Sequence, residues 1–394
     1  MSEACLVFAF GIFKVIYAPH KAFKEIIQNP KYYGPILVLV LFVASNVGLT
    51  YVTASKPFSE QTLPKASEFD AWTENSTLWT ADANVEVSEN NDHINGSYYG
   101  NKSIEFSLTN TYHAWMRLSD IGHVNCTGAL GFKNMSFRVK LNYPDTTAIT
   151  NATVLLSSGA ANYFQYNMTQ ALSTAAKTVW NNFTLPLGAG SGWIESGGQP
   201  DWGNITVVQF EFALSSSTNM TILMDGLFFR GVYRSPLEKE GDIILAYSAA
   251  YSIVQFLVHW ILFAVSLLML ARLLGAHGSL RSFTVVIGFV LITMVVQTLA
   301  NIALYSTLPS IRYPLELFGG PSNEAQVIFN KIAQDIGLVS QLVGIVGLLT
   351  FFWTIFLGGI ATRQLTEFSW SKSLLIAAAA YMVSILVQGL LLQF

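Results

Sequence analysis

Charged residues are scarce in this sequence. Asp, Glu, Lys and Arg make up only 11% of the 394 residues, whereas soluble domains average about 25%. Hydrophobic residues make up 52%, so the deficit of charge indicates segments that never contact water. The formal net charge is only −3, which argues against nucleic acid and other polyanions as partners.

Cysteines and catalytic signatures are also scarce. The two cysteines, Cys5 and Cys126, are too few for a disulfide framework or a cysteine-ligated zinc site. The sequence has no phosphate-binding loop and no HExxH, GxSxG or CxxC motif, which argues against the enzyme classes that depend on them. We therefore expect a protein that is not an enzyme.

Carboxylates in the middle of the chain are the remaining candidates for catalysis, because glycosidases work with a pair of acidic side chains. The spacing of acidic residues along a strand does not reveal such a pair. Acidic side chains at polar strand positions ordinarily carry a charge exposed to solvent. The candidates are Glu105, Asp120, Asp201 and Glu211.

Five segments are long and apolar enough to cross a bilayer as helices. A hydrocarbon core about 30 Å thick needs about 20 mostly apolar residues in a helix. No Asp, Glu, Lys or Arg lies in the core of any of the five. They are Ile36–Ala54, a segment within Ile243–Leu273, Phe283–Tyr305, Ile336–Ile360 and Leu374–Leu392.

These helices divide the chain into four parts. Residues 1–35 precede the first spanning helix, which covers residues 36–54. Residues 55–240 are rich in Asn, Ser, Thr and aromatic side chains and have the length of one globular domain. Residues 241–394 hold the other four helices. The expected fold class is a multi-pass helical membrane protein with an inserted all-β domain.

The distribution of Lys and Arg predicts the orientation, because these residues collect in cytoplasmic loops near helix ends. With the N-terminus in the cytoplasm, the short outer loop after the third helix carries only Arg312 and Lys331. The inner segments carry Lys14, Lys21, Lys24, Lys31, Arg272, Arg281, Arg363 and Lys372. Five crossings then place residues 55–240 and the C-terminus outside the cytoplasm, at the cell membrane.

Glycosylation sequons support this orientation. Every Asn-x-Ser/Thr motif lies within residues 55–240, and glycans are added outside the cytosol. The alternative is chance occurrence in a segment rich in Asn, Ser and Thr. The sequon asparagines are Asn75, Asn95, Asn101, Asn125, Asn134, Asn151, Asn167, Asn182, Asn204 and Asn219.

Alternation of apolar and polar residues predicts strands in the inserted domain. Phe137, Val139 and Leu141 alternate with basic residues, and Ile104–Leu108 shows the same pattern. Such alternation is typical of an antiparallel sandwich with one buried and one wet face. One helical window stands out, at Thr169–Lys177. Further strands are expected at Val154–Ser157, Tyr163–Tyr166, Trp180–Leu185, Phe210–Phe212 and Thr221–Phe229.

The segment Phe69–Tyr233 resembles the galactose-binding-like jelly rolls of many carbohydrate-binding modules. The carrying residues are the run Gly100–Phe106, the run Trp180–Leu185, the segment Pro200–Phe212 and Met224-Asp-Gly-Leu-Phe228. The resemblance implies a β-sandwich that binds glycan or a surface protein. It also implies a structural calcium, with Asp225 as one ligand. The alternative for Asp225 is a turn or hydrogen-bonding role.

Six of the nine tryptophans lie in the inserted domain, where aromatic faces could stack on sugar rings. Trp180 and Trp202 are in strand frames and are expected in the core. Trp115, beside His113, and Trp193, in a glycine-rich loop, are the candidates for a ligand-binding platform. The alternative is that all of them fill the core.

The helical part resembles the Yip family, the Ypt-interacting proteins, over about Val7–Thr53 and Leu245–Phe394. The carrying residues are Pro19-x-x-Ala-Phe23 with Asn29-Pro30, the block Leu270–Phe283 and the count of five helices. The resemblance implies a trafficking scaffold, whose cytoplasmic partner it does not identify. The inserted domain is a departure from the family pattern. We expect the helix after Pro19 to be amphipathic and to lie on the inner leaflet.

The membrane helices contain polar side chains but no charges, whereas ion pathways usually contain ionisable residues. His259 is expected to bond a neighbouring helix. We therefore expect a membrane protein that recognises a ligand through its β domain. The alternative is a transporter or channel whose β domain recruits substrate. The remaining polar candidates are Asn46, Gln255, Gln297, Asn301, Gln341 and Gln388.

Overall fold

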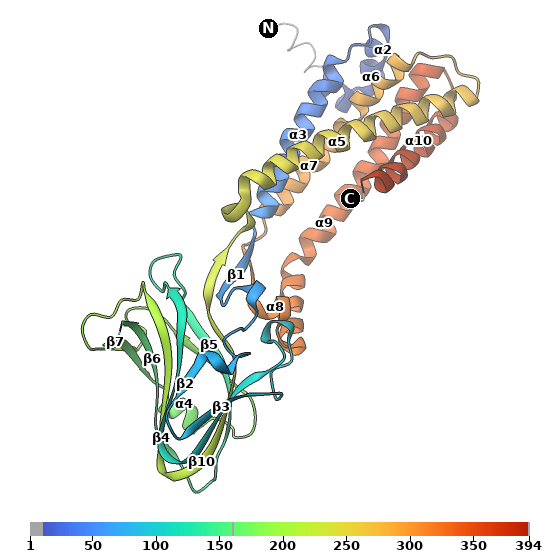
Figure 1. Ribbon diagram of the computed structural model, residues 1–394. Coiled ribbons are helices and arrows are strands. Elements are labelled where there is room, and N and C mark those ends of the chain that lie inside the picture. Colours follow the sequence, from blue (N-terminus) through green and yellow to red (C-terminus); the bar gives the residue numbers. More distant parts are fainter. Residues whose placement is uncertain (1–10, 160, 393–394) are drawn as a thin grey trace. The chain divides into compact units, whose positions relative to one another are not determined.

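A computed structural model describes residues 11–159 and 161–392, and Cys5 lies outside this range. The chain forms two compact units (Figure 1). The helical unit contains the segment through Pro57, Ser235–Ser310 and the chain from Ala333 onward. The β unit contains Phe58–Arg234 and, in addition, Ile311–Ile332.

Within the described residues, five helices are long and apolar enough to span a membrane, which confirms the predicted fold class. The third is made of two segments, α6 and α7, that meet at Leu291. The fourth begins 14 residues before the apolar run, because its first turns are helical but polar. The helices are α3 (Tyr33–Ala54), α5 (Pro236–Leu273), α6 (Leu280–Val290) with α7 (Ile292–Ser306), α9 (Ser322–Thr366) and α10 (Trp370–Leu391).

The amphipathic helix α2 (Pro19–Gln28) differs from the expectation in where its apolar face lies. Phe23 is fully buried, Ala22 nearly so, and both belong to the core of the helical unit. Ile26 and Ile27 pack against the same core. Protein rather than the inner leaflet therefore covers the apolar face, because α6 lies beside it.

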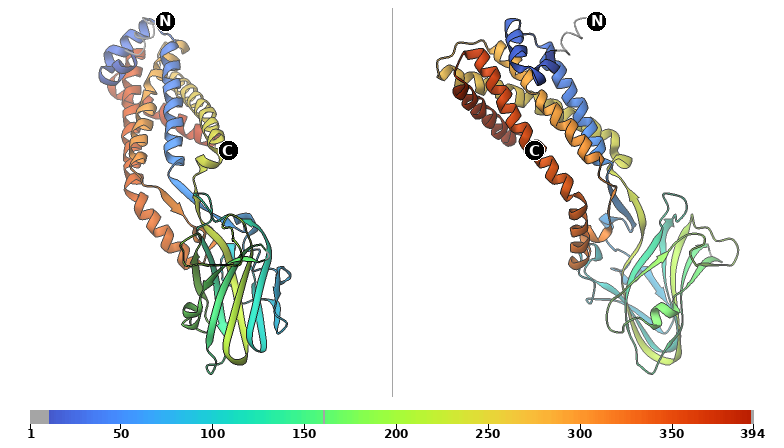
Figure 2. Two further views of the ribbon diagram at one scale, coloured as in Figure 1. Left: turned by 90° about the vertical axis from the view of Figure 1, so that its left-hand side faces the viewer. Right: turned by 180° about the vertical axis from the view of Figure 1, so that it is seen from behind.

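The β unit is an antiparallel sandwich built on two long strands, which confirms the β-sandwich prediction. These are β4 (Ser103–Val124) and β10 (Ile205–Arg234), which pair along most of their lengths. The pairing is interrupted between Ala213 and Thr218. Each long strand therefore contributes one half to each of two sheets (Figure 2).

The partners of β4 and β10 change at this interruption. The first sheet has the order β3–β4–β10–β5–β8, and β1 pairs with the end of β10. The second sheet has the order β2–β4–β10–β6–β7–β9. The other strands are β1 (Pro57–Leu63), β2 (Trp79–Ala81), β3 (Val85–Asn90), β5 (Asn134–Asn142), β6 (Ile149–Gly159), β7 (Asn162–Asn167), β8 (Asn181–Pro186) and β9 (Ile194–Ser196). Within the predicted helical window, the helix α4 covers only Thr169–Ser173.

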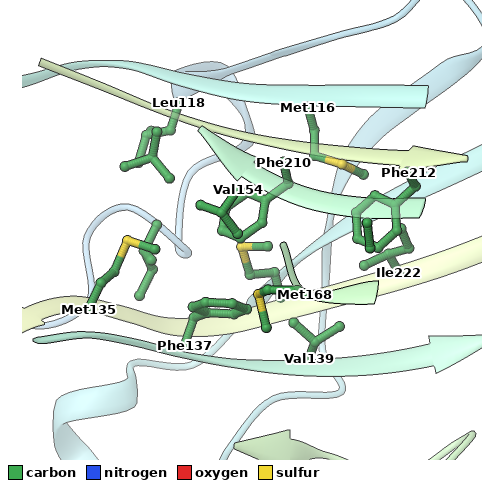
Figure 3. Close-up of a cluster of buried hydrophobic side chains, with 14 of the residues drawn as sticks. Met116, Leu118, Met135, Phe137, Val139, Val154, Met168, Phe210, Phe212 and Ile222 are labelled. Carbon is green, nitrogen blue, oxygen red and sulfur yellow. The ribbon is translucent and has the colours of Figure 1, made fainter. Parts of the chain in front are cut away.

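The core lies between the two sheets (Figure 3). Phe137 of the first sheet meets Phe210 of the second edge to face, with ring centroids 5.1 Å apart. Trp79 meets Phe106 across the same interior at 5.1 Å. Apolar side chains alternate inward along each strand because successive side chains point to opposite faces. The side chains between these inward positions point to the outer faces of the two sheets.

The segment Ile311–Ile332 packs with the β unit, which the sequence did not reveal. It contains β11 (Ile311–Tyr313), which pairs with β1, the helix α8 (Leu315–Gly319) and the first turns of α9. Glu316 forms an ion pair with Arg230, whose guanidinium also binds Glu60 at 2.6 Å. Glu324 binds Arg138 at 2.8 Å. Along the sequence, the chain therefore passes between the β unit and the helical unit four times, at both ends of 58–234 and at both ends of 311–332.

Candidate functional site

The outer face of the second sheet gathers polar and aromatic side chains from four adjacent strands. Arg117 of β4 lies opposite Gln209 of β10, which lies opposite Leu155 of β6. Leu155 in turn lies opposite Gln165 of β7. A second row begins at Trp115 and continues through Glu211 to Thr153. We call these seven residues, together with Tyr163, the strand-crossing face.

Local sequence explains why these side chains point outward. On β4 the inward positions Ala114, Met116 and Leu118 are buried, so Trp115 and Arg117 between them are partly exposed. On β10 the buried Val208, Phe210 and Phe212 leave Gln209 and Glu211 outward in the same way. Alternation with a period of two therefore places one set of side chains in the core and the other set on the strand-crossing face.

The strand-crossing face offers hydrogen-bonding groups of both kinds. Gln209 donates from Nε2 to Glu211 Oε1 at 2.6 Å, which orients the carboxylate. Arg117 Nε and Thr153 Oγ1 are buried and have no hydrogen-bond partner in the described part of the chain. A buried polar atom without a partner is costly, so these two atoms are suited to a ligand or to water.

The two tryptophans predicted as a platform lie in different places. Trp115 is on the strand-crossing face. Trp193 packs against the core instead, with ring centroids 5.1 Å from Tyr166 and 5.6 Å from Trp202. Its Nε1 donates to Pro186 O at 2.7 Å. The structure therefore brings Trp115, but not Trp193, together with the polar groups of the face.

Two of the other tryptophans differ in how deeply they lie. Trp202 stacks on Phe164 at 3.9 Å in the core, as expected. Trp180 is only partly buried, and its Nε1 donates to Asp92 at 3.2 Å. Neither ring belongs to the strand-crossing face.

Two of the candidate catalytic carboxylates, Glu105 and Glu211, lie on different sheets. Glu105 lies opposite Leu223 on the first sheet, and it accepts hydrogen bonds from Ser107 and Asn90. Glu211 points outward from the second sheet. The core separates the outer faces of the two sheets, so these two residues do not flank a common substrate.

Asp225, the expected calcium ligand, is fully buried beside Asp70, which is fully buried too. Asp225 accepts from Ile94 N at 2.6 Å, and Asp70 accepts from the Thr73 hydroxyl at 2.8 Å. Burial and the hydrogen bond to Asp70 raise the pKa of Asp225 to about 9. Burial also raises the pKa of Asp70. The pair therefore favours sharing a proton or binding a cation.

Some features of this carboxyl pair fit calcium. The Oδ1 atoms of Asp70 and Asp225 have no hydrogen-bond partner among the described residues. Gly100, in the left-handed region at φ 65°, lines the pair: a Cβ there would stand 2.9 Å from Asp70 Oδ1. Within the described ranges, no group of three or more His, Cys, Asp or Glu could hold a metal. Backbone carbonyl oxygens would have to complete the ligand set, as calcium allows.

The sequon asparagines all lie outside the core. Asn134 and Asn204 are partly exposed, and the other eight are exposed. Asn151 and Asn167 stand at one end of the strand-crossing face, and Asn125 and Asn204 are beside its other end. Its centre, at Gln209 and Leu155, has no sequon.

Some polar side chains in the helical unit form hydrogen bonds with neighbouring helices. His259 Nδ1 lies 2.6 Å from Gln388 Oε1, which joins α5 to α10, and Asn46 donates to the Ser252 hydroxyl at 3.0 Å. His259 Nε2, Asn301 Oδ1 and Ser373 Oγ are exceptions, since these atoms are buried without a partner among the described residues. These contacts fit interhelical packing better than a continuous pathway.

Comparison with known families gives one match. The model of the Yip1 domain matches residues 186–392, more than half of the chain. The match includes all the spanning helices except the first. A search of curated proteins gives no match.

Solved structures similar to this chain include carbohydrate-binding modules. The family 11 module from Clostridium thermocellum, in complex with a β-1,3-1,4-mixed-linked tetrasaccharide, is 17% identical. It covers 43% of this chain and 94% of its own, with a TM-score of 0.28. The CBM22-1 xylan-binding domain from Paenibacillus barcinonensis is 17% identical. It covers 40% of this chain and 91% of its own, with a TM-score of 0.25.

Proposed function

Because this chain belongs to the Yip1 domain family, we propose that its helices anchor the protein in a membrane and that its β unit recognises a glycan without catalysis. The strand-crossing face is the observation that carries this proposal. It joins an outward tryptophan with unsatisfied or half-exposed hydrogen-bonding groups on a rigid sheet. Such a combination matches a sugar, which has apolar CH faces and a polar rim.

The shape of the strand-crossing face favours a polymer over a single sugar. Its rows run across the strands, and neighbouring strands are about 4.8 Å apart. Four strands therefore offer a row about 14 Å long. Arg117 and Glu211 carry opposite charges, so the face has no net charge of its own. We infer that a neutral polysaccharide is the preferred class of ligand.

The orientation remains part of the proposal. Eight of the ten sequon asparagines are exposed and the other two are partly exposed, which supports glycosylation and hence a β unit outside the cytoplasm, with the N-terminus inside and the C-terminus outside. The carboxyl pair Asp70–Asp225 supports a structural calcium, which would hold the start of the domain to its closing strand. Asp225 and Asp70 would supply carboxylate ligands to such an ion.

Binding by the full chain in detergent tests the proposal. Soluble mixed-linkage β-glucan and xylan serve as neutral probes, and polygalacturonate serves as an anionic one. We expect Trp115→Ala to weaken binding of a neutral probe at least about tenfold, since a buried aromatic contact commonly dominates recognition. Trp193→Phe is the matched control and should bind as wild type does. Equal loss in both variants, or binding of none of the probes, would contradict the proposal.

A further inference from the structure

An open hollow of about 560 Å³ lies on the outer side of the first sheet, away from the strand-crossing face. Three neighbouring strands form it, because Thr221 of β10 lies opposite Ser107 of β4 and Asn142 of β5. The β5–β6 connection adds Tyr143 and Pro144. Hydroxyl and amide groups thus stand beside a proline and the buried Tyr143, a lining that can form hydrogen bonds with a pyranose ring.

Residues of one glycosylation sequon line this hollow. Asn219 and Thr221, the first and third residues of the motif, both line it. They point to the same face of β10, about 6.8 Å apart along the strand. Of the ten sequon asparagines, Asn219 alone is among its lining residues.

The Asn219 side chain is held in one orientation. Its Oδ1 accepts the amide N–H of Asn110 at 2.9 Å. Asn110 is itself fixed, because its own Oδ1 accepts from the Ser217 hydroxyl at 2.9 Å. The amide oxygen is thus engaged, and Nδ2 is the atom left for a covalent bond. Asn219 is exposed, so a donor can reach it.

We propose that Asn219 carries an N-linked glycan whose first sugars occupy this hollow and stabilise the β unit. A lipid-linked oligosaccharide supplies the sugar. Asn219 Nδ2 bonds to its anomeric carbon and loses a proton, and the lipid phosphate leaves with the electron pair of the broken C–O bond. The inference rests on the proposed placement of the β unit outside the cytoplasm, but not on ligand binding by the strand-crossing face.

Glycopeptide mass spectrometry and thermal unfolding of the full chain test the inference. The chain is produced in a host that performs N-glycosylation and in one that does not. We expect Asn219 to be occupied. In the glycosylating host, Asn219→Gln should lower the Tm about 2–4 °C further than Asn95→Gln does, a shift typical of a modest contact in a domain of this size. Asn95 is exposed and does not line the hollow.

The second host separates the glycan from the asparagine itself. Without glycosylation, the extra loss at Asn219 should shrink to what its bond to Asn110 accounts for. An equal extra loss in both hosts would overturn the inference, because the side chain alone would explain it. An unoccupied Asn219 beside occupied sequons would also overturn it while leaving the proposed orientation intact. If every sequon is unoccupied, the orientation fails as well.

Discussion

Replacement of Arg230 by Met should destabilise the β unit strongly. The side chain of Arg230 is 14% exposed and lies between the carboxylates of Glu60 and Glu316, which are 2% and 13% exposed. Removing the guanidinium leaves two nearly buried carboxylates without their counterion. Breaking a buried ion pair in this way costs about 3–5 kcal/mol. For a domain of this size that corresponds to a fall in Tm of about 6–20 °C.

A graded series strengthens this prediction. Glu316→Gln should cost less, because the amide oxygen can still accept a hydrogen bond from Arg230. The amide groups of Gly231 and Leu315 also donate to Glu60, each at 2.9 Å, so part of the cluster survives. Lys177→Met is the matched control: Lys177 pairs with Asp145 at 2.9 Å, but the carboxylate is exposed. That variant should melt close to wild type.

The same cluster predicts a pH dependence. Burial opposes ionisation of Glu316, but the hydrogen bond from Arg230 outweighs it and lowers the pKa of Glu316 below its ordinary value. The folded pKa is then below the unfolded one. The stabilisation is therefore complete above the unfolded pKa and is lost as the pH falls through the folded pKa. Glu316→Gln should reduce this loss of stability in acid.

Thermal unfolding of the full chain, followed by tryptophan fluorescence, measures these effects, since six of the nine tryptophans lie in the β unit. An Arg230→Met protein that melts within about 2 °C of the Lys177→Met control would refute the reasoning. It would mean that water or movement of Ile311–Ile332 relieves the two carboxylates.

Three further predictions concern the metal, the orientation and the helices. Calcium added to chelator-treated protein should raise the Tm by mass action, and Asp225→Asn should abolish the rise. If neither chelator nor calcium changes the Tm, the calcium site is excluded. A cysteine introduced within Ala276–Arg281 should not react with an impermeant reagent on intact cells. Labelling of that cysteine would contradict the proposed topology. Reconstituted vesicles should show no solute flux above protein-free vesicles, and flux that His259→Ala or Asn301→Ala removes would favour a transporter.

Sequence alone predicted the helical unit well because a bilayer imposes a strict requirement. A helix without charge over about 20 residues has few alternatives to spanning a membrane. The limits of α9 were harder to predict: Glu324, Lys331 and Asp335 precede the apolar run but lie within the helix. Hydropathy therefore marked the spanning part of α9 and missed its polar first turns.

The strands were predicted by alternation, but their continuity was not. Ile104–Leu108 belongs to a strand of 22 residues, β4, and Phe210–Phe212 and Thr221–Phe229 belong to one strand, β10. A strand that passes from one sheet to the other bends, and the bend disturbs the local alternation around Ser215–Ser217. The pattern near a bend resembles a turn. The sequence therefore predicted β10 as two short strands, and it predicted only the first part of β4.

The role of Ile311–Ile332 was missed for a different reason. Arg230 and Glu316 are 86 positions apart, and Arg138 and Glu324 are 186 apart. Each residue by itself looks like an ordinary surface charge. Only the strand pairing of β1 with β10 brings Glu60 beside Arg230 and makes a buried site for Glu316. No local pattern carries that information.

The strand-crossing face depends both on local patterns, which the sequence shows, and on the pairing of distant strands, which it does not show. Trp115 was a candidate from the start, whereas Glu211 was interpreted as solvated charge, which is the ordinary outcome at a polar strand position. What distinguishes the face is that β4, β10, β6 and β7 all place large or hydrogen-bonding side chains outward at the same level. The sequence shows which side chains of each strand point outward. Which of these side chains lie side by side on adjacent strands depends on the strand register, and the register follows from the bend shared by β4 and β10. The arrangement of these outward side chains is therefore a property of strand register: a shift of β10 by one residue would bury Gln209 and expose Phe210.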